Sequence, residues 1–282
     1  MTAVEKSDGT VGKALAVLDQ IASYGRPVRF SEILADSSLP KATLYRFVQT
    51  LTNQGMLQFD PERQTYAPGL RLVRLAHSAW AQSSLAPVAR AHVDALSAET
   101  SETVHLAQLD HAQVLYVDKR NALDPVEMYS QAGKVGPAYC TGVGKAMLAF
   151  LPEPELSTVL AQQSWHKFTA NTHGSPDSIR DELRQIRKEG LSFDREEHEA
   201  GIICAAVPIL NSQQRPLGAL SITGTTRRTS LDALSQLGPR LKQAAQAIAH
   251  DAESWLFPHS AAPTPSAHAT TKGETSHVRS DA

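Results

Sequence analysis

The segment from Lys41 to Leu51 carries side chains suited to reading the edges of DNA bases. On a helical wheel its apolar residues fall on one side, and the opposite side presents cationic and hydrogen-bonding groups. Arginine can bridge guanine in the major groove and glutamine can bridge adenine, so Arg46 and Gln49 are the candidate base readers. The other residues that this face is expected to turn toward DNA are Lys41, Ala42, Thr43 and Tyr45.

Other fragments begin like catalytic or phosphate-binding motifs, but none is complete. Ser221 lies in Gly-Ala-Leu-Ser-Ile, which is not the Gly-x-Ser-x-Gly turn of a hydrolase. Tyr139 stands where a phosphate-binding loop begins with glycine. His198 and Glu199 begin a zinc-protease pattern, but Ile202 replaces its second histidine. The sequence therefore predicts no enzyme, no metal site and no cofactor.

Three predicted helices, the first beginning at Val11 with its apolar face running from Ala14 to Ala22, and a hairpin would position the DNA-reading segment. A short helix near Ser31–Ala35, with Ser31 as its N-cap, is followed by a turn and by Pro40, a residue favoured at the start of the next helix. Gly55 ends that helix, and the alternating residues 56–68 predict a two-stranded ribbon. This order predicts a helix-turn-helix with a wing. Arg63 at the tip of the wing is expected to enter the minor groove or to contact phosphate.

Local charge favours contact with phosphates. Residues 10–75 hold eight basic and five acidic side chains, whereas the whole chain holds 27 basic and 29 acidic residues. The net charge of −2 excludes a polybasic binder, and the local positive excess permits a DNA site. The same pattern also fits a small helical bundle whose solvated face contacts other proteins, and the residues alone leave that alternative open.

The composition is that of an ordinary globular protein, with 41% hydrophobic and 20% charged residues in a chain of 282. Its two cysteines, Cys140 and Cys204, are too few for a disulfide framework. No apolar run is long enough to cross a membrane, and the polar first ten residues do not resemble a secretion signal. We therefore expect a cytoplasmic protein without membrane contact.

After the wing, the pattern changes to an amphipathic helix and then to mixed helices and strands typical of an α+β domain with an antiparallel sheet. A hairpin is predicted around residues 110–113. The other predicted strands are Val126–Ser130, Ile202–Ile209 and Leu217–Thr223, and the predicted helices are Gly144–Phe150, Ser178–Glu189 and Leu231–Trp255. The expected organisation is a disordered start (1–9), a winged helix-turn-helix domain (10–70), a linker helix (71–86), a second domain (87–257) and a disordered tail (258–282).

Several separated motifs together resemble one family. The stretch SEILADSSLPKATLYRFVQTLTNQGMLQFDPERQTYAPGLRL resembles the winged helix-turn-helix of the IclR family of bacterial transcription regulators. PAYCTGVGKAMLAFLPE, LRQIRKEGLSFDREEHEAGIICAAVPI and PLGALSITG resemble parts of that family's effector domain. The resemblance runs in order from about Val11 to Trp255. It departs from the family at Lys13, where arginine is usual, and at His111, where glycine is usual.

The resemblance implies a GAF-like effector domain that holds a small ligand. The turn from Thr141 to Gly144 would offer backbone N–H groups to a ligand carboxylate, which suits a helix N-terminus. The glycines could instead serve the turn alone, Cys204 could be an ordinary buried residue, and Ser221 and Thr223 could be ordinary strand residues. The full set implied to bind effector is Met128, Thr141, Gly142, Val143, Gly144, Asp194, Cys204, Ser221 and Thr223.

The function implied by the resemblance is a regulator that binds near-palindromic operators as a homodimer or a dimer of dimers. Its effector would be a small organic acid, and the scarcity of aromatic residues in the implied pocket favours a 2-oxo acid such as glyoxylate or pyruvate. The alternative is a protein of another functional class. In that protein the C-terminal domain binds a metabolite or is enzymatic, and the winged domain contacts other proteins. Salt dependence separates the two, because binding through phosphates weakens steeply with salt.

Overall fold

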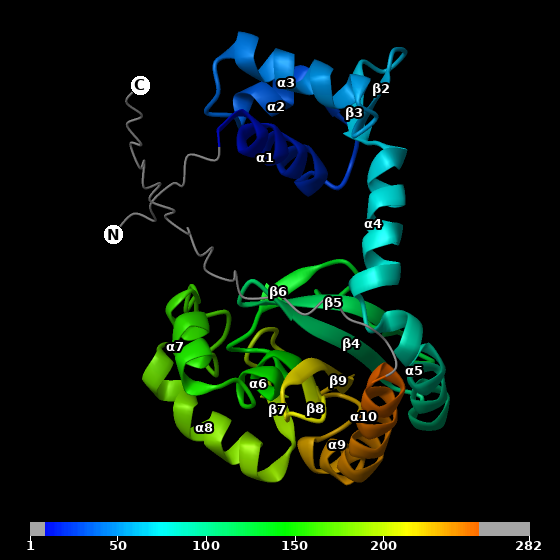
Figure 1. Ribbon diagram of the computed structural model, residues 1–282, viewed down its shortest axis with the longest axis vertical. Helices are drawn as coiled ribbons and strands as arrows, with labels where there is room; N and C mark the ends of the chain where they lie inside the picture. Colours follow the sequence, from blue (N-terminus) through cyan, green and yellow to red (C-terminus); the bar gives the residue numbers. More distant parts are fainter. Residues whose placement is uncertain (1–8, 254–282) are drawn as a thin grey trace, which may run out of the picture.

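The computed structural model describes residues 9–253, which form two units joined by the long helix α4 (Leu70–Ser83) (Figure 1). The expected disordered ends, and Trp255 at the predicted end of the last helix, lie wholly or largely outside these residues. Within the described part, no helix has the length and apolar character needed to cross a bilayer.

The N-terminal unit is a helix-turn-helix with a small sheet. Its elements are α1 (Gly9–Ser23), β1 (Val28–Arg29), α2 (Phe30–Ala35), α3 (Lys41–Asn53), β2 (Leu57–Asp60) and β3 (Thr65–Pro68). The sheet order is β1-β3-β2, so the expected two-stranded ribbon gains a third strand. The prediction of Ser31 as N-cap was wrong, because α2 begins at Phe30 and its N-cap is Arg29, whose amide donates a hydrogen bond to the Glu32 carboxylate.

The C-terminal unit is an antiparallel six-stranded sheet in the order β6-β5-β4-β9-β8-β7, which confirms the predicted α+β class. Its strands are β4 (Thr103–Asp110), β5 (Gln113–Arg120), β6 (Val135–Pro137), β7 (Ser192–Arg195), β8 (Ile202–Leu210) and β9 (Pro216–Thr225). The tight turn between β4 and β5 has positive φ at both His111 and Ala112, the geometry that most often selects Asn-Gly.

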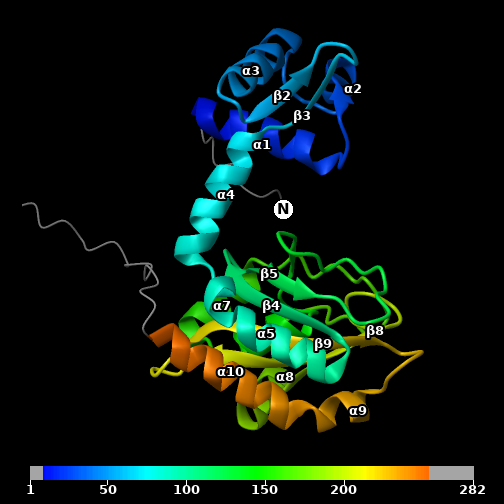
Figure 2. The same ribbon diagram turned by 90° about the vertical axis from the view of Figure 1, so that its right-hand side faces the viewer.

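Helices cover both faces of this sheet. One face packs on α5 (Ala86–Thr100), α9 (Leu231–Gln236) and α10 (Gly238–Glu253), and the other on α6 (Gly142–Leu148), α7 (Glu153–Ala161) and α8 (Pro176–Glu189). Figure 2 shows α5 and α10 side by side, and the pairs Arg240–Glu99 and His92–Asp251 join them. The helices on each face turn their apolar side chains toward the sheet. Two separate apolar layers therefore flank the sheet, one on each face.

Two sequence predictions in this unit were wrong. Residues 126–130 form no strand, because their backbone groups bond to side chains: the Tyr129 amide donates to Glu199 and Lys119 donates to the Ser130 carbonyl. The predicted helix Leu231–Trp255 is two helices. Pro239 explains the break, since proline lacks an N–H and its ring clashes with the carbonyl four residues earlier.

Candidate DNA interface and polar cavity

The exposed side of α3 is the candidate DNA-reading face. Its packing side, Leu44, Phe47, Val48 and Leu51, is buried in the core of the N-terminal unit. Lys41, Ala42, Tyr45 and Arg46 are exposed on the opposite side, with Thr43 and Gln49 half-buried at its margins. The helix therefore presents the cation and the amide that the sequence assigned to base reading, and nothing in the described part of the chain covers Arg46.

A ring contact and a hydrogen bond hold two residues of this face in place. The ring of Tyr45 packs edge-on against Phe30 of α2, with centroids 5.6 Å apart. The amide nitrogen of Gln49 donates to the Tyr66 hydroxyl at 3.4 Å, which ties α3 to the wing strand β3. These contacts line a shallow groove between α3 and the wing. These contacts limit the rotamers of Tyr45 and Gln49 in the free protein. The loss of side-chain entropy on DNA binding is therefore smaller.

Arg63 lies in the turn between β2 and β3, at the tip of the wing. Its side chain is 80% exposed and lies 4.0 Å from the Asp60 carboxylate. Asp60 accepts hydrogen bonds from the Glu62 and Arg63 amides and so shapes the turn. The guanidinium is free to reach a phosphate or a minor groove, which is the role expected for it.

The second candidate site is a polar cavity in the C-terminal unit, on the face of the sheet that packs on α6. Strand alternation places the side chains of residues 105, 204, 221 and 223 on this face, and the apolar Ala107, Ala206 and Ala219 continue it. The register sets His105 opposite Ser221, and Cys204 opposite both Thr223 and Asp194. Four strands thus bring distant parts of the sequence to one small patch.

Seven of the nine predicted effector residues line this cavity. They are Thr141, Gly142, Val143, Asp194, Cys204, Ser221 and Thr223. Met128 is buried outside the lining. Gly144 also lies outside it, and a side chain there would overlap the backbone of Ala138, so its small size serves the packing of α6. The roles of all nine residues stay predictions.

Six further lining residues were not anticipated from the sequence: His105, Tyr116, Ser130, His198, Glu199 and Ile202. His105 lies between two hydroxyl groups: its Nδ1 is 3.2 Å from the Thr223 hydroxyl and its Nε2 is 2.9 Å from the Ser130 hydroxyl. A histidine inside the apolar run VHLAQL was the available signal, since a fully buried imidazole needs polar partners.

Burial controls the charge of the cavity. It lowers the pKa of His105 to about 3, with a smaller effect from Lys119, so the imidazole is neutral at physiological pH. Burial and the nearby Glu197 charge raise the pKa of Asp194 to about 7. Burial also raises the pKa of the Cys204 thiol to about 12, which keeps it protonated. Asp194 is thus poised to exchange a proton near neutral pH.

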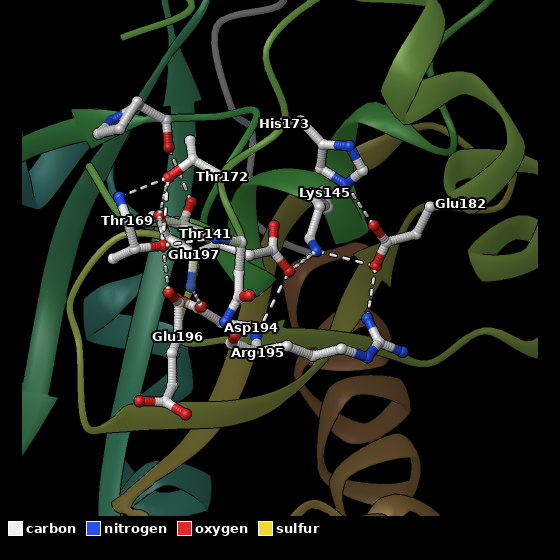
Figure 3. A network of polar contacts seen from close by, with 12 residues as sticks. Thr141, Lys145, Thr169, Thr172, His173, Glu182, Asp194, Arg195, Glu196 and Glu197 are labelled. Carbon is white, nitrogen blue, oxygen red and sulfur yellow. Dashed lines mark hydrogen bonds and ion pairs between the residues drawn. The ribbon is translucent and has the colours of Figure 1, made fainter. Parts of the chain in front are cut away.

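A buried ion network centred on Lys145 of α6 lies next to the cavity wall (Figure 3). Lys145 is fully buried, and its ammonium donates to Glu182 at 2.8 Å and to Glu197. Glu182 also accepts from Arg195 at 2.7 Å and pairs with His173 at 2.7 Å. Burial opposes ionisation of Glu182, but His173, Lys145 and Arg195 outweigh it and hold its pKa at about 2.

The same network is linked to the cavity through the loop after β7. The amide of Glu197 donates to the Asp194 carboxylate at 2.8 Å, and its carbonyl accepts from Thr172 at 2.6 Å. His173, Glu182 and Glu197 are close enough to share a metal ion, but the Lys145 ammonium already bridges both carboxylates. The cluster is therefore a charge-balanced structural network around Lys145.

An exposed third helix with a wing, joined by a helix to a sheet domain with a polar cavity, defines a two-domain DNA-binding transcription regulator. The family descriptions agree: "IclR helix-turn-helix domain" matches residues 10–61 and "Bacterial transcriptional regulator IclR C-terminal" matches residues 77–250. The chain belongs to the IclR family of bacterial transcription regulators, which are not enzymes.

Relatives of the chain share this two-domain length. The regulator XynR of Escherichia coli is 30% identical over 85% of this chain and 95% of its own length. The regulator KdgR of Dickeya chrysanthemi is 30% identical over 87% and 81% of the two chains. The crystal structure of Thermotoga maritima IclR covers 86% of this chain and 97% of its own, at 30% identity and a TM-score of 0.69.

One structural neighbour carries a ligand. An IclR homologue from Microbacterium hydrocarbonoxydans, crystallised with 4-hydroxybenzoate, covers 87% of this chain and 99% of its own with a TM-score of 0.72. Its identity of 22% supports a shared fold alone.

Proposed function

We propose that this chain binds near-palindromic operator DNA as a homodimer or a dimer of dimers, and that a small organic acid in the cavity changes its affinity for that DNA. The exposed cationic face of α3 supports the first half of the proposal. The observation that carries the second half is the polar cavity, into which seven predicted effector residues converge. Its interior position favours a small molecule over a macromolecule.

Subunit pairing is supported by apolar side chains exposed on α1 and α4. Monomeric proteins seldom leave clustered apolar residues in water, and such clusters often mark contacts between chains. Contacts between subunits through α1, which belongs to the DNA-reading unit, and through α4, which adjoins it, would set the spacing of two half-sites. The exposed residues concerned are Val11, Leu15, Leu70, Val73 and Leu75.

A compact acid fits the cavity better than a bulky one. The free space between its side chains is about 30 Å³, so a large ligand would require the surrounding loops to move. In the described part of the chain no lysine or arginine lines it. A carboxylate would therefore rely on the backbone of residues 141–143 and on the hydroxyl groups of Ser221 and Thr223. Glyoxylate and pyruvate are the first acids to test.

Thermal-shift measurement of the full-length protein against a panel of small carboxylic acids tests the effector half directly. A ligand that binds the folded state raises the melting temperature by mass action, by an amount that grows with its concentration. The panel should include glyoxylate, pyruvate and 4-hydroxybenzoate. If no acid raises the melting temperature while the protein still binds DNA selectively, the organic-acid proposal fails and the regulator assignment stands.

Acid binding is expected to weaken as pH rises through 7. The Asp194 carboxyl, with its pKa raised to about 7, must be protonated to accept a neighbouring anion without repulsion. Because binding then takes up a proton, the affinity should fall by up to about tenfold per pH unit above pH 7. Titration of an acid found in the panel, followed by calorimetry between pH 6 and 9, measures this slope.

Asp194→Asn is the matched control for that slope. The amide keeps an oxygen for the Glu197 N–H but cannot ionise, so the variant should bind the acid with little dependence on pH. An unchanged slope in the variant would assign the titration to another group. His105 is not expected to contribute, since its pKa of about 3 keeps it neutral over this range.

Operator binding is expected to weaken strongly with salt. If each subunit of a dimer uses Lys41 and Arg63 on phosphates, four cations replace counterions on the DNA. Affinity should then fall roughly 100-fold between 50 and 200 mM salt. Fluorescence anisotropy with a duplex selected from a random library measures this. A nearly flat salt response would favour the alternative in which the winged unit contacts proteins.

A further inference from the structure

Strand β5 is bulged where it passes between the cavity and helix α4. Leu106 pairs with Asp118, and Ala107 pairs with Tyr116, so Val117 has no partner on β4. A bulge of this kind redirects side chains and frees a carbonyl, and such features often occur beside functional sites. Alternation along β5 places Tyr116 on the cavity side of the sheet and Val117, the unpaired residue of the bulge, on the opposite side.

Tyr116 borders two separate spaces. It lines the polar cavity, where its ring lies 5.4 Å from that of His105. It also lines an apolar groove next to α4, together with Trp80, Leu115 and Val117. A change in the position of Tyr116 therefore alters both spaces at once.

The loop of residues 121–134 is attached to the same point. Its Gly133 amide donates to the Tyr116 carbonyl at 2.7 Å, and the Tyr116 amide donates to the Lys134 carbonyl at 3.0 Å. The same loop supplies Ser130, whose hydroxyl contacts His105 in the cavity. The loop thus connects the cavity wall to the backbone of the bulge.

Trp80 of α4 contacts the bulge on the side of the sheet opposite the cavity. Residues 73–79 of α4 are exposed, and Trp80 is where this helix first packs against the core of the C-terminal unit. Its indole N–H donates to the Val117 carbonyl at 3.4 Å, the carbonyl of the bulged residue. The Arg90 guanidinium covers its ring at 5.7 Å and His77 stacks on it.

We propose that the bulge at Tyr116–Val117 transmits the state of the cavity to α4, and that Trp80 is the positioning residue that receives it. The proposal rests on the proposed function, since it explains how an occupied cavity reaches the DNA-binding unit. A ligand in the cavity, or a change at Ser130, shifts the loop of residues 121–134 and Tyr116, and the Val117 carbonyl passes this shift to Trp80. Because α4 carries the winged unit, a small shift at Trp80 changes the placement of α3 (Figure 1).

A double-mutant cycle on the full-length protein tests this without a known effector. Ser130→Ala disturbs the cavity wall, and Trp80→Phe keeps an aromatic ring but removes the indole N–H. We expect Ser130→Ala to change the dissociation constant for the selected operator duplex at least fivefold in the wild-type background. In the Trp80→Phe background the same change should be less than twofold.

Trp165→Phe is the matched control. Trp165 also donates its indole N–H to a backbone carbonyl, that of Leu160 at 3.2 Å, but it lies away from α4. The Ser130→Ala effect should persist in that background, and melting temperatures should confirm that all variants fold. Equal effects in the Trp80→Phe and wild-type backgrounds, or no effect of Ser130→Ala in either, would overturn the proposal. Failure of the wild-type protein to select any duplex would instead reject the proposed function.

Discussion

Replacing Arg46 with alanine is expected to abolish sequence-selective operator binding. A well-placed bidentate contact from arginine to guanine contributes about 1–3 kcal/mol of base discrimination, and a symmetric dimer would lose two such contacts. The affinity for the selected duplex should therefore fall by roughly 30-fold to 10⁴-fold. Binding to a scrambled duplex should fall far less, because it depends on phosphate contacts. Anisotropy titrations with the two duplexes measure the ratio.

Two further variants sharpen that experiment. Arg46→Lys keeps the charge but loses the planar fork, so selectivity should still be lost while non-selective binding is retained. Lys188→Ala removes an exposed cation on α8 of the other unit and should change neither quantity. If Arg46→Ala keeps the wild-type ratio between the two duplexes, α3 does not read bases through this residue.

Replacing Lys145 with methionine is expected to destabilise the C-terminal unit by about 3–5 kcal/mol. Lys145 is fully buried between Glu182 and Glu197, and its removal leaves carboxylates without their ammonium partner. One oxygen of Glu197 already lacks a hydrogen-bond partner, so little compensation is available nearby. The melting temperature should fall by roughly 10 °C, which calorimetry or circular dichroism measures.

A second substitution distinguishes the loss of the Lys145 ion pairs from the loss of packing around its side chain. Adding Glu197→Gln to Lys145→Met removes the charge that the first change leaves buried, so part of the lost stability should return. The exposed Lys188→Met is the control and should change the melting temperature very little. A Lys145→Met protein with wild-type stability would show that the ion network is not needed for the fold.

The sequence by itself determined the features that depend on local periodicity. The buried and exposed sides of α3 follow from its 3.6-residue repeat, because Leu44, Phe47 and Val48 recur on one side wherever the helix packs. The antiparallel class followed from short alternating segments and a tight turn at residues 110–113. Motif resemblance added the family and most of the cavity residues, which spacing alone does not connect.

Only the tertiary structure decided where backbone hydrogen bonds go and which distant residues meet. Residues 126–130 alternate like a strand, but side-chain partners satisfy their backbone groups instead of a neighbouring strand. His105 joins Thr223 through strand register, and Val117 loses its partner through a bulge between two strands. The register between β4 and β9 depends on pairing between segments far apart in the chain, and a bulge depends on how two whole strands pair, so the pattern within one segment carries no information about either.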